Sequence, residues 1–300
     1  MRVLLAEPRG FCAGVSRAIE ATREALRRFR PPVYLPHHVV HNEIVVRDLE
    51  ARGAVAVDGV AAVPDGAVCV FSAHGSPPGD YALAQQKGLR VIDAACPLVV
   101  KVHNEAKRYQ REGYQVVLIG HQGHQEVRGT TGQAPMLLLS EDEEPPALQG
   151  PVAVLTQTTL SKQDVAAAVE RIRQRSPGAV VRDDICYAVS NRQDAVVAMV
   201  RQGAEVVLIL GSLSSSNSVR MKDVAEAHGA RGYLLMTAEE LDPALLEGVS
   251  CVGVSSGAST PEHLVQELLE ALRERYDAQV EPVVVAQEEH ILFTPPRELR

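Results

Sequence analysis

The sequence predicts an α/β protein with parallel sheets, built from three similar units. Short β-branched runs such as QVVLIG, VAVLTQ and EVVLIL alternate with amphipathic stretches, a pattern typical of parallel strands buried on both faces. Cys12, Cys96 and Cys186 recur 84 and 90 residues apart, each between a strand-like and a helical stretch. This recurrence predicts α/β units over residues 13–96 (with 1–12 leading to the first cysteine), 97–186 and 187–277, and a C-terminal tail over 278–300.

The helical stretches follow the cysteines directly. AGVSRAIEATREALRRF follows Cys12, PLVVKVHNEAKRYQRE follows Cys96, and YAVSNRQDAVVAMVRQG follows Cys186, all with apolar residues at helical spacing. Two further helices are expected in SKQDVAAAVERIRQR and TPEHLVQELLEALRERY, with Ser161 and Thr260 as their N-caps. If the three units surround a pseudo-threefold axis in a trilobed arrangement, the loops at their strand ends converge on one central site.

Composition narrows the class of protein. The net charge of −8 argues against a nucleic-acid partner, which requires a basic face. No apolar run approaches the roughly 20 residues that cross a bilayer, and Val3 to Ala6 is too short for a signal peptide, so no membrane association and a cytoplasmic location are expected. An odd number of cysteines, five, argues against a disulfide framework in such a compartment.

The five cysteines fall into two groups. Cys69 and Cys251 lie within apolar strand-like runs and are expected to be core residues. Cys12, Cys96 and Cys186 lie at strand-to-helix junctions, where the helix N-terminus favours the metal-binding thiolate. Three thiolates without local spacing suit an iron–sulfur cluster assembled from distant segments, with one iron of a [4Fe–4S] cluster left open to substrate. Zinc bound by three cysteines and a histidine is the alternative, and spacing does not separate the two.

The strand-end loops also carry neutral hydrogen-bond donors, near glycines and probable helix starts that suit phosphate oxygens. No Walker A or GxGxxG motif is present, so a small phosphorylated metabolite is favoured over a nucleotide. Glu126 is the one acidic residue among these donors, and burial beside an anion would raise its pKa and make it a proton donor. The donors are His41, His74, His124, Thr158, Ser215, Ser216, Asn217 and Ser259.

These residues stand in motifs that resemble a known family. PRGFCAGVSRAI, HHVVHN, FSAHGS, DAACPLVVKVH, IGHQGHQEVRGT, TQTTLS, DDICYAVSNRQ, GSLSSSNS and SSGAST occur in order along the whole chain. Together they resemble the 4-hydroxy-3-methylbut-2-enyl diphosphate reductases, the last enzymes of the methylerythritol phosphate route to isoprenoids. The tail EEHILFTPPRELR is similar to the family's C-terminal segment. Three positions depart from the family pattern: Gln125 replaces a usual Pro, and Ala95 and Ser190 replace common Thr residues.

The resemblance implies a trilobed α/β fold around one [4Fe–4S] cluster held by Cys12, Cys96 and Cys186. It implies that the His, Ser and Asn donors hold the diphosphate, that Thr158 contacts the substrate hydroxyl network, and that Glu126 supplies protons. The implied reaction is a two-electron reductive dehydroxylation of (E)-4-hydroxy-3-methylbut-2-enyl diphosphate to isopentenyl and dimethylallyl diphosphate. An external carrier such as ferredoxin or flavodoxin would deliver the electrons, since no flavin or nicotinamide motif is present.

Two other functions are consistent with the same residues. A zinc-dependent hydrolase of a small phosphorylated metabolite would use the same cysteines and histidines, and would be colourless with no redox requirement. A non-catalytic iron–sulfur sensor would be coloured but would not turn over the allylic diphosphate.

Overall fold

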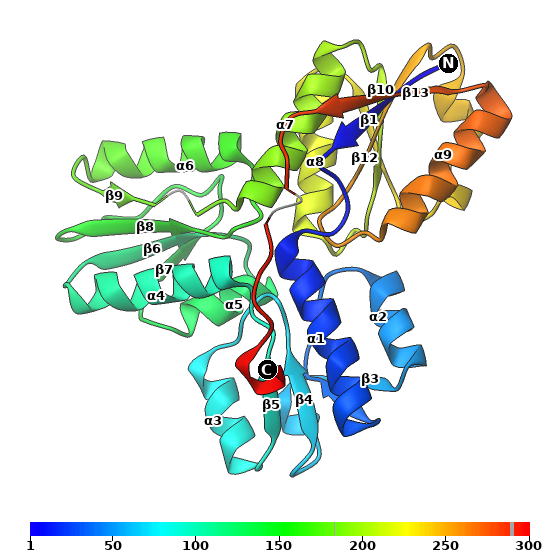
Figure 1. Cartoon of the computed structure of the whole chain (residues 1–300). Coiled ribbons are helices and arrows are strands. Elements are labelled where there is room, and N and C mark those ends of the chain that lie inside the picture. Colours follow the sequence, from blue (N-terminus) through cyan, green and yellow to red (C-terminus); the bar gives the residue numbers. More distant parts are fainter. Residues whose placement is uncertain (183, 289–290) are drawn as a thin grey trace. The chain divides into compact units, whose positions relative to one another are not determined.

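The computed structural model describes residues 1–182, 184–288 and 291–300, and within them the strands form three parallel sheets (Figure 1). All of the strand pairs recorded in these sheets are parallel, and helices separate successive strands along most of the chain. The predicted α/β class with parallel sheets is therefore confirmed. Glu289 and His290, in the predicted tail, lie outside the described residues, as does Asp183.

The largest sheet has five strands and combines the two ends of the chain. Its order is β11 (Arg231–Leu235), β10 (Val206–Leu210), β12 (Cys251–Ser256), β1 (Arg2–Glu7) and β13 (Gln279–Val284). Figure 1 shows β1 in blue beside β13 in red, and their register runs from Arg2 opposite Gln279 to Glu7 opposite Val284. Helix α9 (Glu262–Tyr276) packs on one face, and α7 (Tyr187–Arg201) and α8 (Ser216–Ala227) pack on the other.

The second sheet has four strands in the order β3 (Ala54–Ala56), β2 (Val33–Leu35), β4 (Val68–Phe71) and β5 (Arg90–Asp93). The helices in this part of the chain are α1 (Ala13–Phe29), α2 (Glu43–Ala51) and α3 (Pro78–Gln86), with the short 3-10 helix η1 (Val60–Ala62). Cys69 and Phe71 of β4 pack with Ala84 of α3 in the core of this sheet. Cys69 is fully buried, as expected for a core cysteine.

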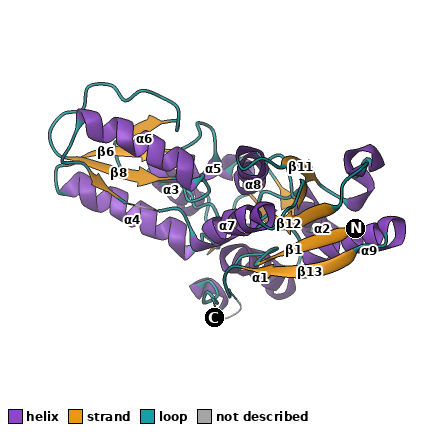
Figure 2. Cartoon of the chain, turned by 90° about the horizontal axis from the view of Figure 1, so that it is seen from above, coloured by secondary structure: helices purple, strands orange, loops and turns teal. Residues whose placement is uncertain are grey.

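The third sheet has the order β7 (Leu137–Leu139), β6 (Gln115–Ile119), β8 (Val152–Thr156) and β9 (Val180–Val181). Helix α4 (Pro97–Arg111) packs on one face and α6 (Lys162–Arg175) on the other, while α5 (Gln125–Thr131) follows β6. Figure 2 shows these helices in purple on both sides of the orange strands. Three more 3-10 helices lie near the C-terminal part of the chain: η2 (Ala238–Glu240), η3 (Pro243–Leu246) and η4 (Arg297–Leu299).

The chain divides into two compact units, each containing complete sheets. Unit 1 is Met1–Ala13, His41–Val45 and Tyr187–Leu292, with the five-stranded sheet, and unit 2 is Gly14–Val40, Val46–Cys186 and Phe293–Arg300, with both four-stranded sheets. The segment 1–12 contributes β1, and the expected tail contributes β13. The division into three units around a pseudo-threefold axis stays a prediction.

The two expected N-caps have different outcomes. The side chain of Ser161 accepts hydrogen bonds from the amides of Gln163 and Asp164 at the start of α6, which confirms this cap. The prediction for Thr260 is wrong, because α9 is capped one residue later by Pro261, without a side-chain hydrogen bond. The Thr260 hydroxyl instead donates to the carbonyl of Leu210 at 3.0 Å. This hydroxyl is therefore hydrogen-bonded to the buried end of β10 rather than to the first turn of α9.

Candidate functional site

Cys12, Cys96 and Cys186 each stand immediately before a helix, as predicted. Helices α1, α4 and α7 begin at Ala13, Pro97 and Tyr187, directly after the three cysteines. The three cysteine residues are partly exposed, whereas Cys69 and Cys251 are buried in strands, and all five are thiols rather than disulfides. Burial raises the pKa of Cys69 to about 12, so this thiol stays protonated and is a poor ligand.

Each cysteine of the first group is joined through its backbone to a strand-end loop. The amide of Cys12 donates to the carbonyl of Ala258 at 3.1 Å, beside Ser259. The amide of Cys96 donates to Ala73 at 2.9 Å, beside His74, and the amide of Cys186 donates to Thr158 at 3.0 Å. In all three places, the cysteine is held next to a residue that is predicted to contact the substrate. The first of these bonds lies within unit 1, and the other two lie within unit 2.

The carboxyl group of Glu126 is enclosed by Thr158 in unit 2. Its Oε1 accepts from the amide of Thr158 at 2.7 Å, and its Oε2 accepts from the Thr158 hydroxyl at 2.9 Å. Glu126 is 2% exposed, and burial raises its pKa to about 7, although the two Thr158 hydrogen bonds act in the opposite direction. The charge of Asp184 also raises this pKa. A carboxyl group with a pKa near neutral can carry a proton to a buried substrate.

Two histidines lie beside this carboxyl group in the chain or in space. His124 caps α5, where its Nδ1 accepts from the amide of Glu126 at 3.2 Å. The rings of His74, after β4, and His124, after β6, meet edge to face with centroids 5.9 Å apart. Unit 2 therefore brings together loops from both of its sheets, and one of the two imidazoles caps the helix turn that carries Glu126.

Two glycines allow the loops that carry His74 and His124 to lie close together. Gly75 has φ +77°, in the left-handed region that favours glycine, and a Cβ there would lie 2.6 Å from Cε1 of His103. A Cβ on Gly129 of α5 would lie 3.0 Å from the carbonyl oxygen of Gly75. His103 is buried, and burial lowers its pKa to about 4, so it packs against both glycines as a neutral ring.

The remaining candidates lie in unit 1. Ser215 caps α8, and its hydroxyl accepts from that of Ser218 at 3.1 Å, while Ser216 is the first residue of the helix. Asn217 is 3% exposed, and among the described residues no hydrogen-bond partner is recorded for its buried Oδ1. The hydroxyl of Ser259 donates to the carbonyl of His41 at 2.9 Å. These loops follow β10, β12 and β2 and surround helix starts, which are suited to anions.

The candidate pairs that the structure brings together include Glu126 with Thr158, His74 with His124, and Ser259 with His41. The first two pairs lie in unit 2 and the third in unit 1. Within the described ranges, no group of three His, Cys, Asp or Glu side chains has an arrangement that could ligate a single metal ion. The chemistry of these three cysteines instead suits a larger iron–sulfur group, since each is a partly exposed thiol residue directly before a helix.

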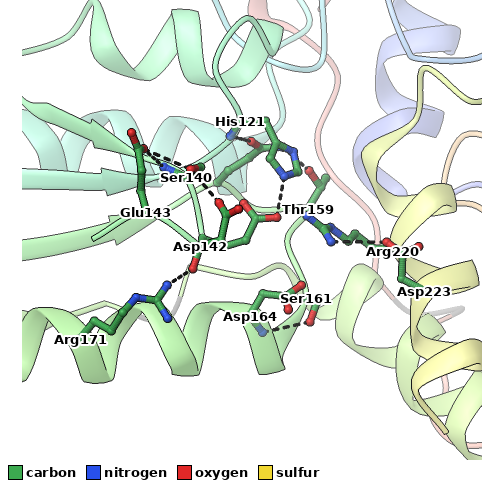
Figure 3. A network of polar contacts seen from close by, with 12 residues as sticks. His121, Ser140, Asp142, Glu143, Thr159, Ser161, Asp164, Arg171, Arg220 and Asp223 are labelled. Carbon is green, nitrogen blue, oxygen red and sulfur yellow. Dashed lines mark hydrogen bonds and ion pairs between the residues drawn. The ribbon is translucent and has the colours of Figure 1, made fainter. Parts of the chain in front are cut away.

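Another polar network surrounds His121, which was not a candidate (Figure 3). Its Nε2 lies 2.9 Å from Oε1 of Glu141, and its amide donates to the side-chain oxygen of Gln157 at 3.0 Å. The guanidinium of Arg171 donates to the carbonyl of Glu141. His121 therefore orders the loop that leads to His124, a structural role.

Sequence reasoning missed Asp184, which is buried and acts on the pKa of Glu126 from two residues before Cys186. The acidic pair preceding Cys186 in DDIC was a visible signal for it, but nothing local indicated its target. None of the helices in the described residues has the length and apolar character required to cross a lipid bilayer.

Comparisons with known proteins agree along the whole chain. A family model described as LytB protein matches residues 3–273. The 4-hydroxy-3-methylbut-2-enyl diphosphate reductase of Mycobacterium leprae is 50% identical over 100% of this chain and 92% of its own length, and that of Azotobacter vinelandii is 47% identical over 100% and 98%. The solved structure of the E-1-hydroxy-2-methyl-but-2-enyl-4-diphosphate reductase from Plasmodium falciparum matches with a TM-score of 0.94 and 34% identity, over 99% of this chain and 96% of that one.

Proposed function

The chain belongs to the LytB protein family, and from this premise we propose that it reduces (E)-4-hydroxy-3-methylbut-2-enyl diphosphate. Two electrons and two protons remove the allylic hydroxyl as water, and the products are isopentenyl and dimethylallyl diphosphate. The full-length similarity to relatives that carry this reductase name supports the assignment. Neither a zinc hydrolase nor an iron–sulfur sensor is favoured by any of these observations.

The proposal rests on three backbone hydrogen bonds, each of which joins one of the three cysteines to a loop that is predicted to bind the substrate. Cys12 is joined to the Ser259 loop, Cys96 to the His74 loop, and Cys186 to Thr158 itself. A redox group held by the three thiols would thereby stand beside the residues selected to bind the substrate. Proximity of this kind is required for electron transfer to a bound alcohol and is not required of a sensor.

The LytB family consists of iron–sulfur enzymes, and the proposed cofactor is one [4Fe–4S] cluster held by Cys12, Cys96 and Cys186. When bound, it would supply electrons and an iron that lacks a protein ligand and acts as a Lewis acid. The accessible position of the three thiols at helix N-termini supports this assignment. The burial of Cys69 and Cys251 in strands supports leaving both out of the proposed ligand set.

The diphosphate is proposed to be held by neutral donors and imidazoles at the strand ends. The capped start of α8 supports an anion at that loop. The side-chain amide of Asn217, whose Nδ2 donates to Sδ of Met221 at 3.6 Å, can also donate to a phosphate oxygen. The imidazoles add donors that can become cationic when the anion binds. The full set is His41, His74, His124, Ser215, Ser216, Asn217 and Ser259.

Glu126 is proposed as the proton source and Thr158 as its partner toward the substrate hydroxyl. The pKa of about 7 lets Glu126 hold a proton at neutral pH and release it to a departing hydroxyl group. The Thr158 hydroxyl, 2.9 Å from Oε2, can relay hydrogen bonding between this carboxyl and the substrate. Burial of Glu126 keeps bulk water from supplying the proton at random.

The electrons are proposed to come from an external carrier such as ferredoxin or flavodoxin. A reducing compartment, the cytoplasm, is the proposed location, because the reaction depends on cysteines that remain thiolates.

Anaerobic purification followed by iron and sulfide analysis tests the cofactor, and turnover with dithionite, a viologen mediator and the allylic diphosphate tests the reaction. We expect a coloured protein that forms both diphosphate products. Cys96→Ser should lose the cluster, and the matched Cys69→Ser should retain it. A colourless, zinc-containing active protein would contradict the proposal, as would a coloured protein without turnover, or equal cluster loss in both variants.

A further inference from the structure

Three basic residues form a repeated contact pattern around the cysteine segments. Each lies five or six residues after one cysteine, in the helix that this cysteine precedes, and contacts the segment just before the next cysteine in cyclic order. The pattern joins Arg17 to the segment before Cys96, Lys101 to the segment before Cys186, and Arg192 to the segment before Cys12. We call these three contacts the cation links. Each lies wholly within one of the two units.

The first link is made by Arg17 of α1, within unit 2. Its Nη1 donates to the backbone carbonyl of Ala95 at 2.9 Å, and its Nη2 donates to that of Asp93 at 3.3 Å, so it holds the three residues before Cys96. Its Nε donates to the carbonyl of Thr294 at 2.8 Å. Burial lowers the pKa of Arg17, whereas the charge of Asp93 raises it.

The second link is made by Lys101 of α4, also within unit 2. Its Nζ lies 3.2 Å from Oδ1 of Asp184, whose side chain is fully buried, while the Lys101 side chain is 54% exposed. Asp184 stands two residues before Cys186. A buried carboxylate paired with a cation fixes the loop that carries it, because the unpaired charge would be costly to bury.

The third link is made by Arg192 of α7, within unit 1. Its Nη2 donates to the carbonyl of Gly10 at 2.7 Å, two residues before Cys12, and its Nη1 donates to Ala188 and contacts Glu288. Arg192 is fully buried. An arginine that is wholly enclosed and directed at a backbone carbonyl is a built contact rather than a surface pair.

We propose that Arg17, Lys101 and Arg192 are positioning residues that fix the backbone before each cysteine and so orient the three thiols toward a common iron–sulfur group. The inference rests on the proposed function, because it assumes that these cysteines hold the cluster. Each cysteine amide is already anchored to a strand-end loop, and the cation link supplies the second point that sets the direction of the segment. Partners outside the ligand set commonly control metal retention in this way.

The same helices offer matched controls. Arg27 of α1, Arg111 of α4 and Arg201 of α7 are exposed basic residues nearer the C-terminal ends of their helices. Replacing each with methionine changes the same charge on the same helix without touching a cysteine segment. If the total charge of the chain alone governs the rate of cluster loss, the variants of the cation links and the control variants will lose the cluster at the same rate.

The test uses the full chain reconstituted anaerobically with iron and sulfide. The readout is the rate at which a ferrous chelator bleaches the visible absorbance, with the melting temperature of the metal-free chain as a check of folding. Arg17→Met, Lys101→Met and Arg192→Met should each lose the cluster about tenfold faster, while the three controls match the parent. Arg192→Lys, which keeps the buried charge opposite Glu288, replaces Arg192→Met if that variant does not fold, and it should lose the cluster faster than the parent.

Lys101 and Asp184 allow a sharper test, because both partners of this link are side chains. Lys101→Met combined with Asp184→Asn should accelerate cluster loss no more than the worse single change, since both remove one contact. Cluster loss at the parent rate in all three methionine variants overturns the inference, and so does additive loss in the double variant. If the parent chain itself takes up no iron and sulfide, the proposed function fails, and that result is distinct.

Discussion

The strand-end loops of the two units present different kinds of polar group. In unit 2 they carry His74, His124 and Glu126, and the Glu126 carboxyl has its pKa raised to about 7. In unit 1 the described loops carry mainly hydroxyl and amide groups, arranged around the capped start of α8, together with the imidazole of His41. A carboxyl group with a pKa near neutral thus lies in one unit, and mainly neutral hydrogen-bonding groups lie in the other. The contrast predicts that proton delivery depends on unit 2, and that the neutral donors of unit 1 act on retention of the anion, together with the imidazoles, without taking part in proton delivery.

The largest expected effect follows from removing the proton of Glu126. Glu126→Gln keeps the size of the side chain and its contacts to Thr158 but cannot donate an acidic proton, so turnover should fall about 10²- to 10⁴-fold. Cluster content and substrate affinity should remain close to those of the parent. Single-turnover assays with the reduced enzyme measure the loss. Near-normal turnover would assign proton delivery to another group and break the contrast between the units.

The pH profile sharpens the same assignment. The acid form of Glu126 is the active one, so kcat/KM should decline with an apparent pKa of about 7 and fall roughly tenfold per pH unit above it. Glu126→Gln should lack this limb in its residual activity. A parent profile that is flat from pH 6 to 9 would contradict the role, because the fraction of protonated Glu126 changes across that range.

Stability should follow the same carboxyl group. Its folded pKa of about 7 exceeds the ordinary value of 4.5, so the folded chain binds more protons than the unfolded chain between these limits. The free energy of unfolding should therefore decrease as pH rises from about 4.5 to 7, by up to about 3 kcal/mol from this group. Comparing melting temperatures of the parent and Glu126→Gln across that window isolates the contribution. Identical pH slopes would show that the carboxyl is not buried in solution.

A change in unit 1 should have a different signature. Asn217→Ala removes a buried amide, and if this group binds the diphosphate, KM should rise about 10- to 100-fold with little change in kcat or in the pH profile. The buried Oδ1 has no recorded partner among the described residues, and the substitution removes the hydrogen bond of 3.6 Å from Nδ2 to Sδ of Met221. A loss confined to kcat would mean that unit 1 also contributes to the chemical step.

The sequence predicted the local features of this arrangement well. The helices after Cys12, Cys96 and Cys186, and the burial of Cys69 in a strand, follow from hydrophobic periodicity along short stretches. The cap at Ser161 was confirmed, whereas the cap at Thr260 was wrong, because its hydroxyl is used by a strand 50 residues away.

Features that depend on contacts between residues far apart in the chain could not be predicted from the sequence. The pairing of β1 with β13 joins opposite ends of the chain, and the Arg192 link to Gly10 spans 182 residues. No periodicity encodes such contacts, since burial and hydrogen-bond demand are settled only when the chain packs. The buried carboxyl of Asp184 is a further case, because its effect on Glu126 arises from proximity in space.

The smallest expected effect concerns the packing that holds His74 near His124. A methyl group on Gly129 would lie 3.0 Å from the carbonyl oxygen of Gly75, a backbone atom that cannot turn aside. Alanine gains about 1 kcal/mol of helix propensity in α5, but crowding of this kind costs about 1–3 kcal/mol, so Gly129→Ala should be destabilised by about 1 kcal/mol. Its melting temperature should fall by a few degrees, while Gly178→Ala, which meets no atom within 4 Å, should not. If turnover of Gly129→Ala also falls more than its stability loss explains, the spacing of the two imidazoles contributes to the reaction as well as to folding. A melting temperature at or above that of the parent would instead mean that the loop after β4 yields freely, and that the two rings are not held by this contact.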